Sequence, residues 1–70
     1  MRKEVIKEMI GKYFEEVSGI YFERNKIYYS MGGFIDALTV TNMITSQENT
    51  ILLGQLANWY DSDDEFKGEF

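Results

Sequence analysis

The sequence predicts an α+β fold, with two helices packed on one face of a short antiparallel sheet in the order α-β-β-β-α. Three observations predict it: a helical repeat of apolar residues near the N-terminus, a period-two pattern over residues 20–31, and a helix-capping pair at Thr45 and Glu48. In this prediction residues 1–60 form one compact domain, and residues 61–70 form an acidic C-terminal tail. A chain of 70 residues is near the lower limit for a domain that folds alone.

The first predicted element is a helix over residues 5–17, where apolar residues recur at helical spacing. At about 100° per residue they cover one half of the helical wheel. Gly19 is expected to end this helix in the left-handed conformation, with Ile20 turned back on Phe14. We expect the apolar face to cover a core; the alternative is that it binds a groove on a partner. Its residues are Val5, Ile6, Met9, Ile10, Tyr13, Phe14 and Val17.

Residues 20–31 predict a β-hairpin with a two-residue turn at Asn25-Lys26. This register divides the ribbon into one largely apolar face and one amphipathic face, which favours the pairing. Asn-Lys is a weaker turn signal than Asn-Gly, so a longer loop is the alternative. The first face carries Ile20, Phe22, Arg24, Ile27, Tyr29 and Met31, and the second carries Tyr21, Glu23, Tyr28 and Ser30.

Gly32-Gly33 predicts a second turn, and residues 34–44 after it have two interpretations. The β-branched run Thr39-Val40-Thr41 favours a third antiparallel strand, which we prefer. The alternative is a helix, because several residues of the segment also recur at helical spacing.

Thr45 and Glu48 form the pattern of a capping box that opens a second helix. This helix is expected to end near Tyr60 and to leave Ile51 exposed, outside the inward stripe. The stripe consists of Leu52, Leu53, Leu56, Ala57, Trp59 and Tyr60.

Composition excludes several kinds of site, because the chain has no histidine and no cysteine. Disulfides, His/Cys zinc sites and the Ser-His-Asp and Cys-His catalytic arrangements all need one of these residues. Asp36 and Glu23 have no partner visible in the sequence that would tune them for acid–base work. Gly32-Gly33 lacks the lysine and the hydroxyl residue of a phosphate-binding loop. The sequence therefore predicts that the protein is not an enzyme and that it binds no cofactor and no metal ion.

The net charge of −5 is concentrated at the C-terminal end. Without a Lys/Arg cluster, direct binding to nucleic acid is not expected. No apolar run approaches the ~20 residues that span a bilayer, and the N-terminus lacks the apolar stretch of a secretory signal. We therefore expect no membrane association and a cytoplasmic location. The last ten residues contain Asp61, Asp63, Asp64, Glu65 and Glu69 against Lys67 alone, a net of −4.

The tail is the first candidate binding site. Its acids could steer the chain to a basic surface, where two aromatic rings would anchor it; the alternative is a frayed, solubilising terminus. The acids at alternate positions resemble the start of an EF-hand loop, but Phe66 stands where that loop needs glycine, so no calcium site is expected. The candidate residues are Asp61, Asp63, Asp64, Glu65, Phe66 and Phe70.

The second candidate is the pair Tyr21 and Tyr28 on the outer face of the hairpin. Exposed tyrosines are enriched in binding hot spots, although a cross-strand pair also stabilises a ribbon by itself. Together these features predict a non-enzymatic protein-binding module that modulates or inhibits a larger partner with a basic surface, such as a nucleic-acid-processing enzyme. In size and charge it is analogous to small acidic inhibitors encoded by phages and mobile elements. The alternative is a homo-oligomeric structural or assembly subunit that associates through an edge strand and the exposed aromatic residues.

Overall fold

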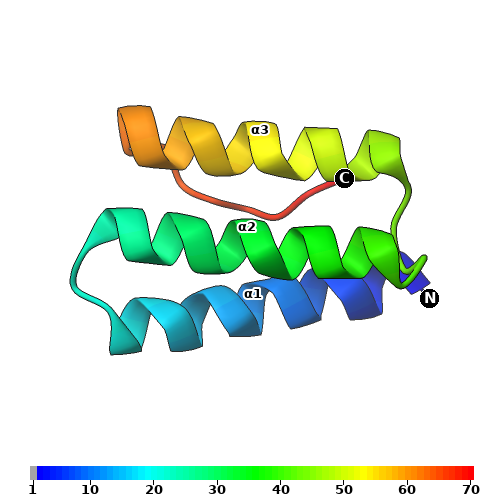
Figure 1. Cartoon of the computed structure of the whole chain (residues 1–70), viewed down its shortest axis with the longest axis horizontal. Helices are drawn as coiled ribbons and strands as arrows, with labels where there is room; N and C mark the ends of the chain where they lie inside the picture. The colour runs from blue at the N-terminus through cyan, green and yellow to red at the C-terminus, as the bar shows by residue number, and fades with distance from the viewer. Residues whose placement is uncertain (1) are drawn as a thin grey trace.

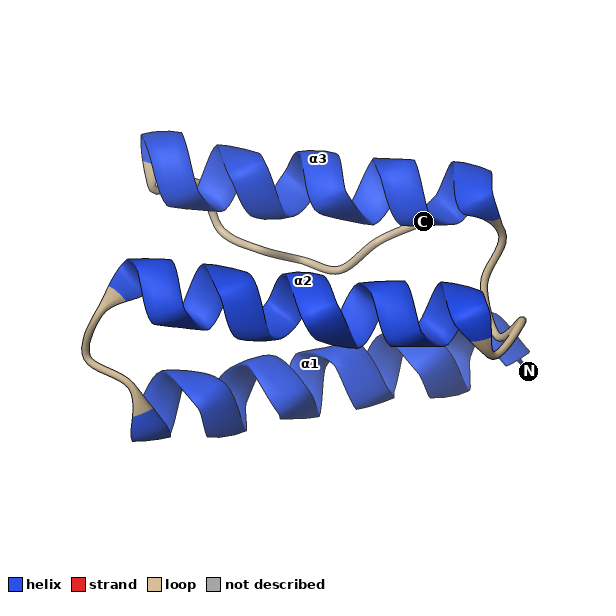
Figure 2. Ribbon diagram, viewed as in Figure 1, coloured by secondary structure: helices blue, strands red, loops and turns tan. Residues whose placement is uncertain are grey.

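The protein is a bundle of three antiparallel α-helices in the computed structural model, which describes residues 2–70 (Figures 1 and 2). The helices are α1 (Arg2–Ile20), α2 (Arg24–Val40) and α3 (Ser46–Ser62), and residues 63–70 follow without regular structure. The described residues include no β-strand. The predicted α+β fold is therefore wrong, and the fold is all-α.

The core forms because each helix buries residues spaced three, four or seven apart, which places them on one face. Helix α2 lies in the middle and packs against both neighbours. No Cα atom of α1 comes within 8 Å of a Cα atom of α3 in the described part of the chain. The buried residues are Ile6, Ile10, Val17, Ile27, Met31, Ile35, Leu38, Ile44, Leu52 and Leu56.

The hairpin predicted over residues 20–31 is absent. Helix α1 continues through Gly19 to Ile20, and the predicted turn at Asn25-Lys26 lies in the first turn of α2. Phe22, which the predicted hairpin placed on its apolar face, is fully exposed in the short connection between α1 and α2. The period-two pattern failed because burial in α2 follows the helical period, and tertiary packing overrides the strand preference of aromatic residues.

Gly32 and Gly33 lie inside α2 and do not form the predicted turn. A Cβ atom built on either glycine meets nothing within 4 Å, so no close approach requires glycine there. Each glycine weakens a helix by up to about 1 kcal/mol relative to alanine. Helix α2 tolerates the pair because Met31 and Ile35, on either side, are completely buried.

The third strand predicted over residues 34–44 is also wrong, because residues 34–40 are the C-terminal half of α2. The helix then ends in a Schellman motif, with Asn42 in the left-handed region at φ 63°. The amide of Met43 donates to the carbonyl of Leu38 at 2.9 Å, and the amide of Asn42 donates to that of Thr39 at 3.0 Å. The β-branched run Thr39-Val40-Thr41 thus forms the end of a helix and its C-cap, where the sequence predicted a strand.

The capping box at the start of α3 is confirmed. The Glu48 amide donates to the Thr45 hydroxyl oxygen at 3.1 Å, and the Thr45 amide donates to the Glu48 carboxylate at 2.9 Å. Leu52 and Leu56 are buried and Ile51 is exposed, as predicted. The helix runs two residues beyond the predicted end, to Ser62.

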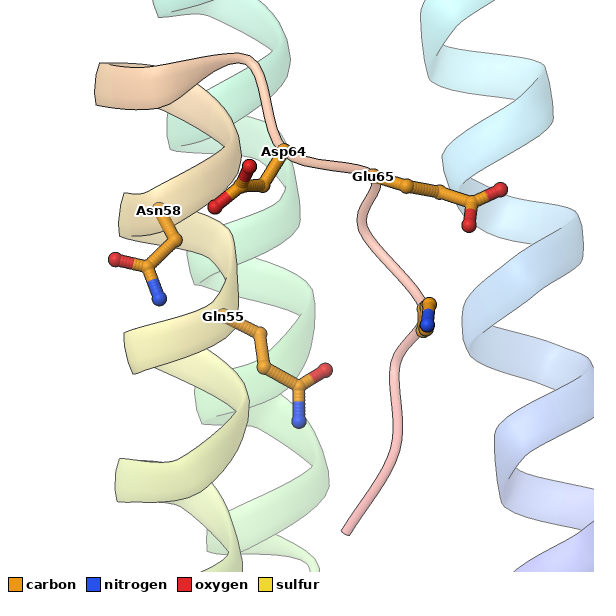
Figure 3. Close-up of a pocket in the computed structure, with 5 residues that line it drawn as sticks. Gln55, Asn58, Asp64 and Glu65 are labelled. Atoms are coloured by element: carbon orange, nitrogen blue, oxygen red, sulfur yellow. The ribbon is translucent and has the colours of Figure 1, made fainter.

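Residues 63–70 turn back at Asp63, which has a φ of 59°, and run beside α3 toward its N-terminal end (Figure 1). They lie between α3 and α1 (Figure 3), the two helices that do not contact each other through their backbones. The tail therefore completes the packing of the bundle. Within the described residues, no helix combines the length and apolar character needed to cross a membrane.

Candidate protein-binding surface

Exposed aromatic rings gather at one end of the bundle, where α1 ends, α2 begins and α3 ends (left in Figure 1). Phe22 is fully exposed, and the exposed fraction of Tyr29 is 72%. We call this surface the aromatic end. It comprises Tyr21, Phe22, Tyr28, Tyr29 and Tyr60.

Tyr28 joins the rings of the two helices. It is half-buried in α2, with its ring centroid 4.8 Å from that of Tyr60 on α3 and 5.8 Å from that of Tyr29. Beside these rings, a shallow depression opens between the α1–α2 connection and the end of α3. It is lined by Phe22, Glu23, Arg24, Asn25, Tyr60 and Asp61.

Arg24 holds the start of α2 against the end of α3. Its guanidinium lies 4.4 Å from the ring centroid of Trp59 and donates to the Asp63 carboxylate at 2.9 Å. It also donates to the main-chain carbonyl of Trp59, in the last turn of α3. A cation at the C-terminal end of a helix offsets the negative end of the helix dipole. Arg24 therefore fixes the geometry of the aromatic end.

The acids of the aromatic end and of the first residues of the tail fall into two groups. Glu23 pairs with Lys26 at 3.4 Å, and Asp63 pairs with Arg24 at 2.9 Å. The second group has no ion pair among the described residues and is exposed to solvent. It consists of Asp61, Asp64 and Glu65. The surface consequently presents aromatic rings next to uncompensated negative charge.

The structure places the predicted site residues in different regions. Tyr21, Tyr28 and Asp61 lie at the aromatic end, and Asp63 binds Arg24 there, whereas Asp64 and Glu65 line a separate pocket with Gln55 and Asn58. Phe66 and Phe70 instead pack against the core from the groove between α1 and α3. The acids and the two phenylalanines therefore do not form the single docking tail described by the sequence prediction.

Phe22, Tyr29 and Tyr60 were not among the predicted site residues. The hairpin register placed Phe22 and Tyr29 on the core-facing side, and the stripe of the last helix included Tyr60. A helical phase for α2, set by Ile27 and Met31, places Tyr29 on the outer side and would have identified it.

A polar pocket lies between α3 and the first residues of the tail. In Figure 3 the Gln55 side chain extends from α3 toward the tail, and Glu65 points away from α3 toward α1. The pocket is lined by Gln55, Asn58, Asp64, Glu65 and Lys67. Among the described residues, no three acidic side chains are close enough together to hold a metal ion.

We compared the chain with protein-family models, with curated proteins and with solved structures, and none of the three comparisons gave a match.

Proposed function

We propose that this protein is a non-enzymatic binding module that modulates or inhibits a larger protein with a basic surface. The observation that carries the proposal is the aromatic end, where exposed rings lie next to the unpaired Asp61, with the unpaired acids Asp64 and Glu65 three and four residues further along the chain. Rigid aromatic side chains are the commonest anchors of protein interfaces. Unpaired charges at the edge of such a surface accelerate the encounter with an oppositely charged partner.

The same combination supports lysine and arginine as the residues contacted on the partner. A guanidinium or ammonium group binds to the face of an aromatic ring and to a carboxylate, and the aromatic end offers both beside its depression. Arg24 on Trp59 is an example of this contact within the chain itself. A protein that processes nucleic acid has such a basic surface, and a small acidic chain that covers it would act as an inhibitor. We also propose a cytoplasmic location for this function, as expected from the sequence.

The test is to capture the partner from the native host with the full chain and to measure binding rates by surface plasmon resonance. We expect Phe22→Ala with Tyr60→Ala to raise the off-rate, because these changes remove anchors. Asp61→Asn with Asp64→Asn should lower the on-rate and its dependence on salt. Unchanged rates for both variants would refute the proposal.

Two controls match these variants. Val40→Ala removes an exposed apolar side chain at the opposite end of α2. Glu8→Gln removes a carboxylate that forms an ion pair with Lys12, at 3.6 Å on the same helix. Neither control is expected to change the rates.

Self-association through the aromatic end is the second candidate. The edge strand that the sequence predicted for this contact is absent from the described residues, but Ile20 and Phe22, two residues apart in the chain, are strongly exposed. Two copies would bring their unpaired acids together, which opposes the contact at low salt. Light scattering over a range of concentrations separates the two candidates, because only self-association produces dimers without a partner.

A further inference from the structure

The groove between α1 and α3 is a second binding feature, separate from the aromatic end and independent of the proposed function. The two helices do not approach each other through their backbones, and residues 66–70 occupy the space between them. The chain has no regular secondary structure there, and it contacts the groove through side chains and through its own backbone. The structure thus holds a peptide segment in a helical groove.

Two aromatic rings, four residues apart, anchor this segment. The ring centroid of Phe66 is 5.1 Å from that of Phe14 on α1, and the Phe14 ring meets Trp59 of α3 edge-to-face at 5.3 Å. Phe70 is half-buried against the core, and the Lys3 ammonium lies 5.7 Å from its ring centroid. Each ring therefore has its own place in the groove.

Gly68, midway between the rings, is buried and has a φ of +65°, which favours glycine. A Cβ atom at this position would lie 3.0 Å from Cγ2 of Ile10, which is closer than nine in ten real contacts of this kind. The groove consequently selects glycine at this position on two independent grounds, backbone conformation and space.

Gln55 on α3 binds the backbone of the segment. Its Oε1 accepts a hydrogen bond from the Glu69 amide at 3.0 Å, and its Nε2 donates to the Glu69 carbonyl. A side-chain amide that pairs with both main-chain groups of one residue recognises extended backbone whatever its side chain is. The side chains of Lys67 and Glu69 are exposed, so the groove can distinguish one peptide sequence from another only at positions 66, 68 and 70.

We propose that this groove is a binding site for an extended segment of a partner protein with the pattern aromatic-x-glycine-x-aromatic, and that the tail of the chain occupies it until such a segment displaces it. The residues that connect the tail to α3 support displacement. Asp64 and Glu65 are exposed, carry like charges and have no ion pair among the described residues. Release of the tail therefore breaks only the contacts made inside the groove.

The test uses the full chain and a fluorescein-labelled peptide with the sequence of residues 64–70, followed by fluorescence anisotropy. The tethered tail competes with the peptide at a high effective concentration, so wild type should bind it weakly. Gly68→Ala in the chain loosens the tail, and we expect it to bind the peptide about tenfold more tightly than wild type does. Adding Gln55→Ala should abolish this gain, whereas Asn58→Ala, a matched amide beside the groove, should preserve it.

Equal affinity of the wild-type and Gly68→Ala chains for the peptide would overturn the proposal, as would a gain that survives Gln55→Ala. Phe70→Ala is a second way to loosen the tail without backbone strain, and it should act in the same direction. If circular dichroism showed that both chains lose their helices, the groove could not exist without its own tail, and the proposal would fail. A wild-type dimer that exchanges tails would identify a second copy as the occupant and would also overturn it.

Discussion

The substitution Gly33→Ala distinguishes a helix from a turn in the middle of the chain. Gly33 is exposed within α2, its φ is not positive, and a Cβ atom added there meets nothing within 4 Å. Alanine is better than glycine in an exposed helix by about 0.5–1 kcal/mol. For a domain of this size, that gain corresponds to a rise in Tm of about 2–8 °C.

Gly68→Ala is the matched control, since the same chemical change is made where φ is +65° and Ile10 Cγ2 is 3.0 Å away. A left-handed conformation costs a residue other than glycine roughly 1–2 kcal/mol, so this variant should be less stable than wild type. The tail can leave the groove while the helices remain folded. The loss of stability in Gly68→Ala therefore cannot exceed the free energy that holds the tail in the groove.

Thermal and urea unfolding, followed by circular dichroism at 222 nm, measure both variants. We expect opposite signs, with Gly33→Ala more stable and Gly68→Ala less stable than wild type. In a Gly32-Gly33 turn with positive φ, alanine would instead be destabilising. A lower Tm for Gly33→Ala would therefore refute the assignment of these glycines to α2.

Three other outcomes are expected. Phe22→Asp should change the free energy of unfolding by less than about 0.5 kcal/mol, because the Phe22 side chain is fully exposed; unfolding of this variant by urea at a much lower midpoint would contradict its placement. Leu56→Ala should cost about 2–5 kcal/mol, whereas Ile51→Ala, on the exposed side of the same helix, should cost far less; equal Tm shifts would be inconsistent with the core. The hydrogen bond from the Thr45 amide, followed by the charges of Arg2 and Lys3, lowers the pKa of Glu48 from its usual 4.5. Its contribution to stability is thus complete above that value and is lost as the pH falls through the lowered pKa, so urea midpoints between about pH 6 and pH 3 should decline more for wild type than for Glu48→Gln.

The ends of the fold were predictable from the sequence and its middle was not. Thr45 and Glu48 specify the start of α3 through hydrogen bonds between near neighbours, and such local chemistry is visible in a sequence. Residues 20–40 contain so many aromatic and aliphatic side chains that both a period of two and a helical period can be drawn through them. Only packing against α1 and α3 selects the helical period, which buries Ile27, Met31 and Ile35.

Part of the candidate site could likewise be predicted from the sequence, and part of it could not. Asp61 lies in the last turn of α3 and the acids at positions 63–65 follow that helix directly, so their exposure can be predicted from its length. The direction of Phe66 depends on Phe14, and the position of Gly68 depends on Ile10, which lie more than fifty residues earlier in the chain. Contacts at that sequence separation leave no periodic pattern, so the sequence alone predicts that the two phenylalanines of the tail are exposed anchors.

The most direct test of the account is a nuclear Overhauser measurement between the α protons of Gly68 and the γ2 methyl group of Ile10 in the isotope-labelled full chain. Helix α1, the turn at Asp63 and the groove between α1 and α3 must all be formed for these groups to meet. We expect a strong cross-peak between them. A spectrum in which the Gly68 α protons show contacts only to their chain neighbours would contradict both the packing of the tail and the groove built on it.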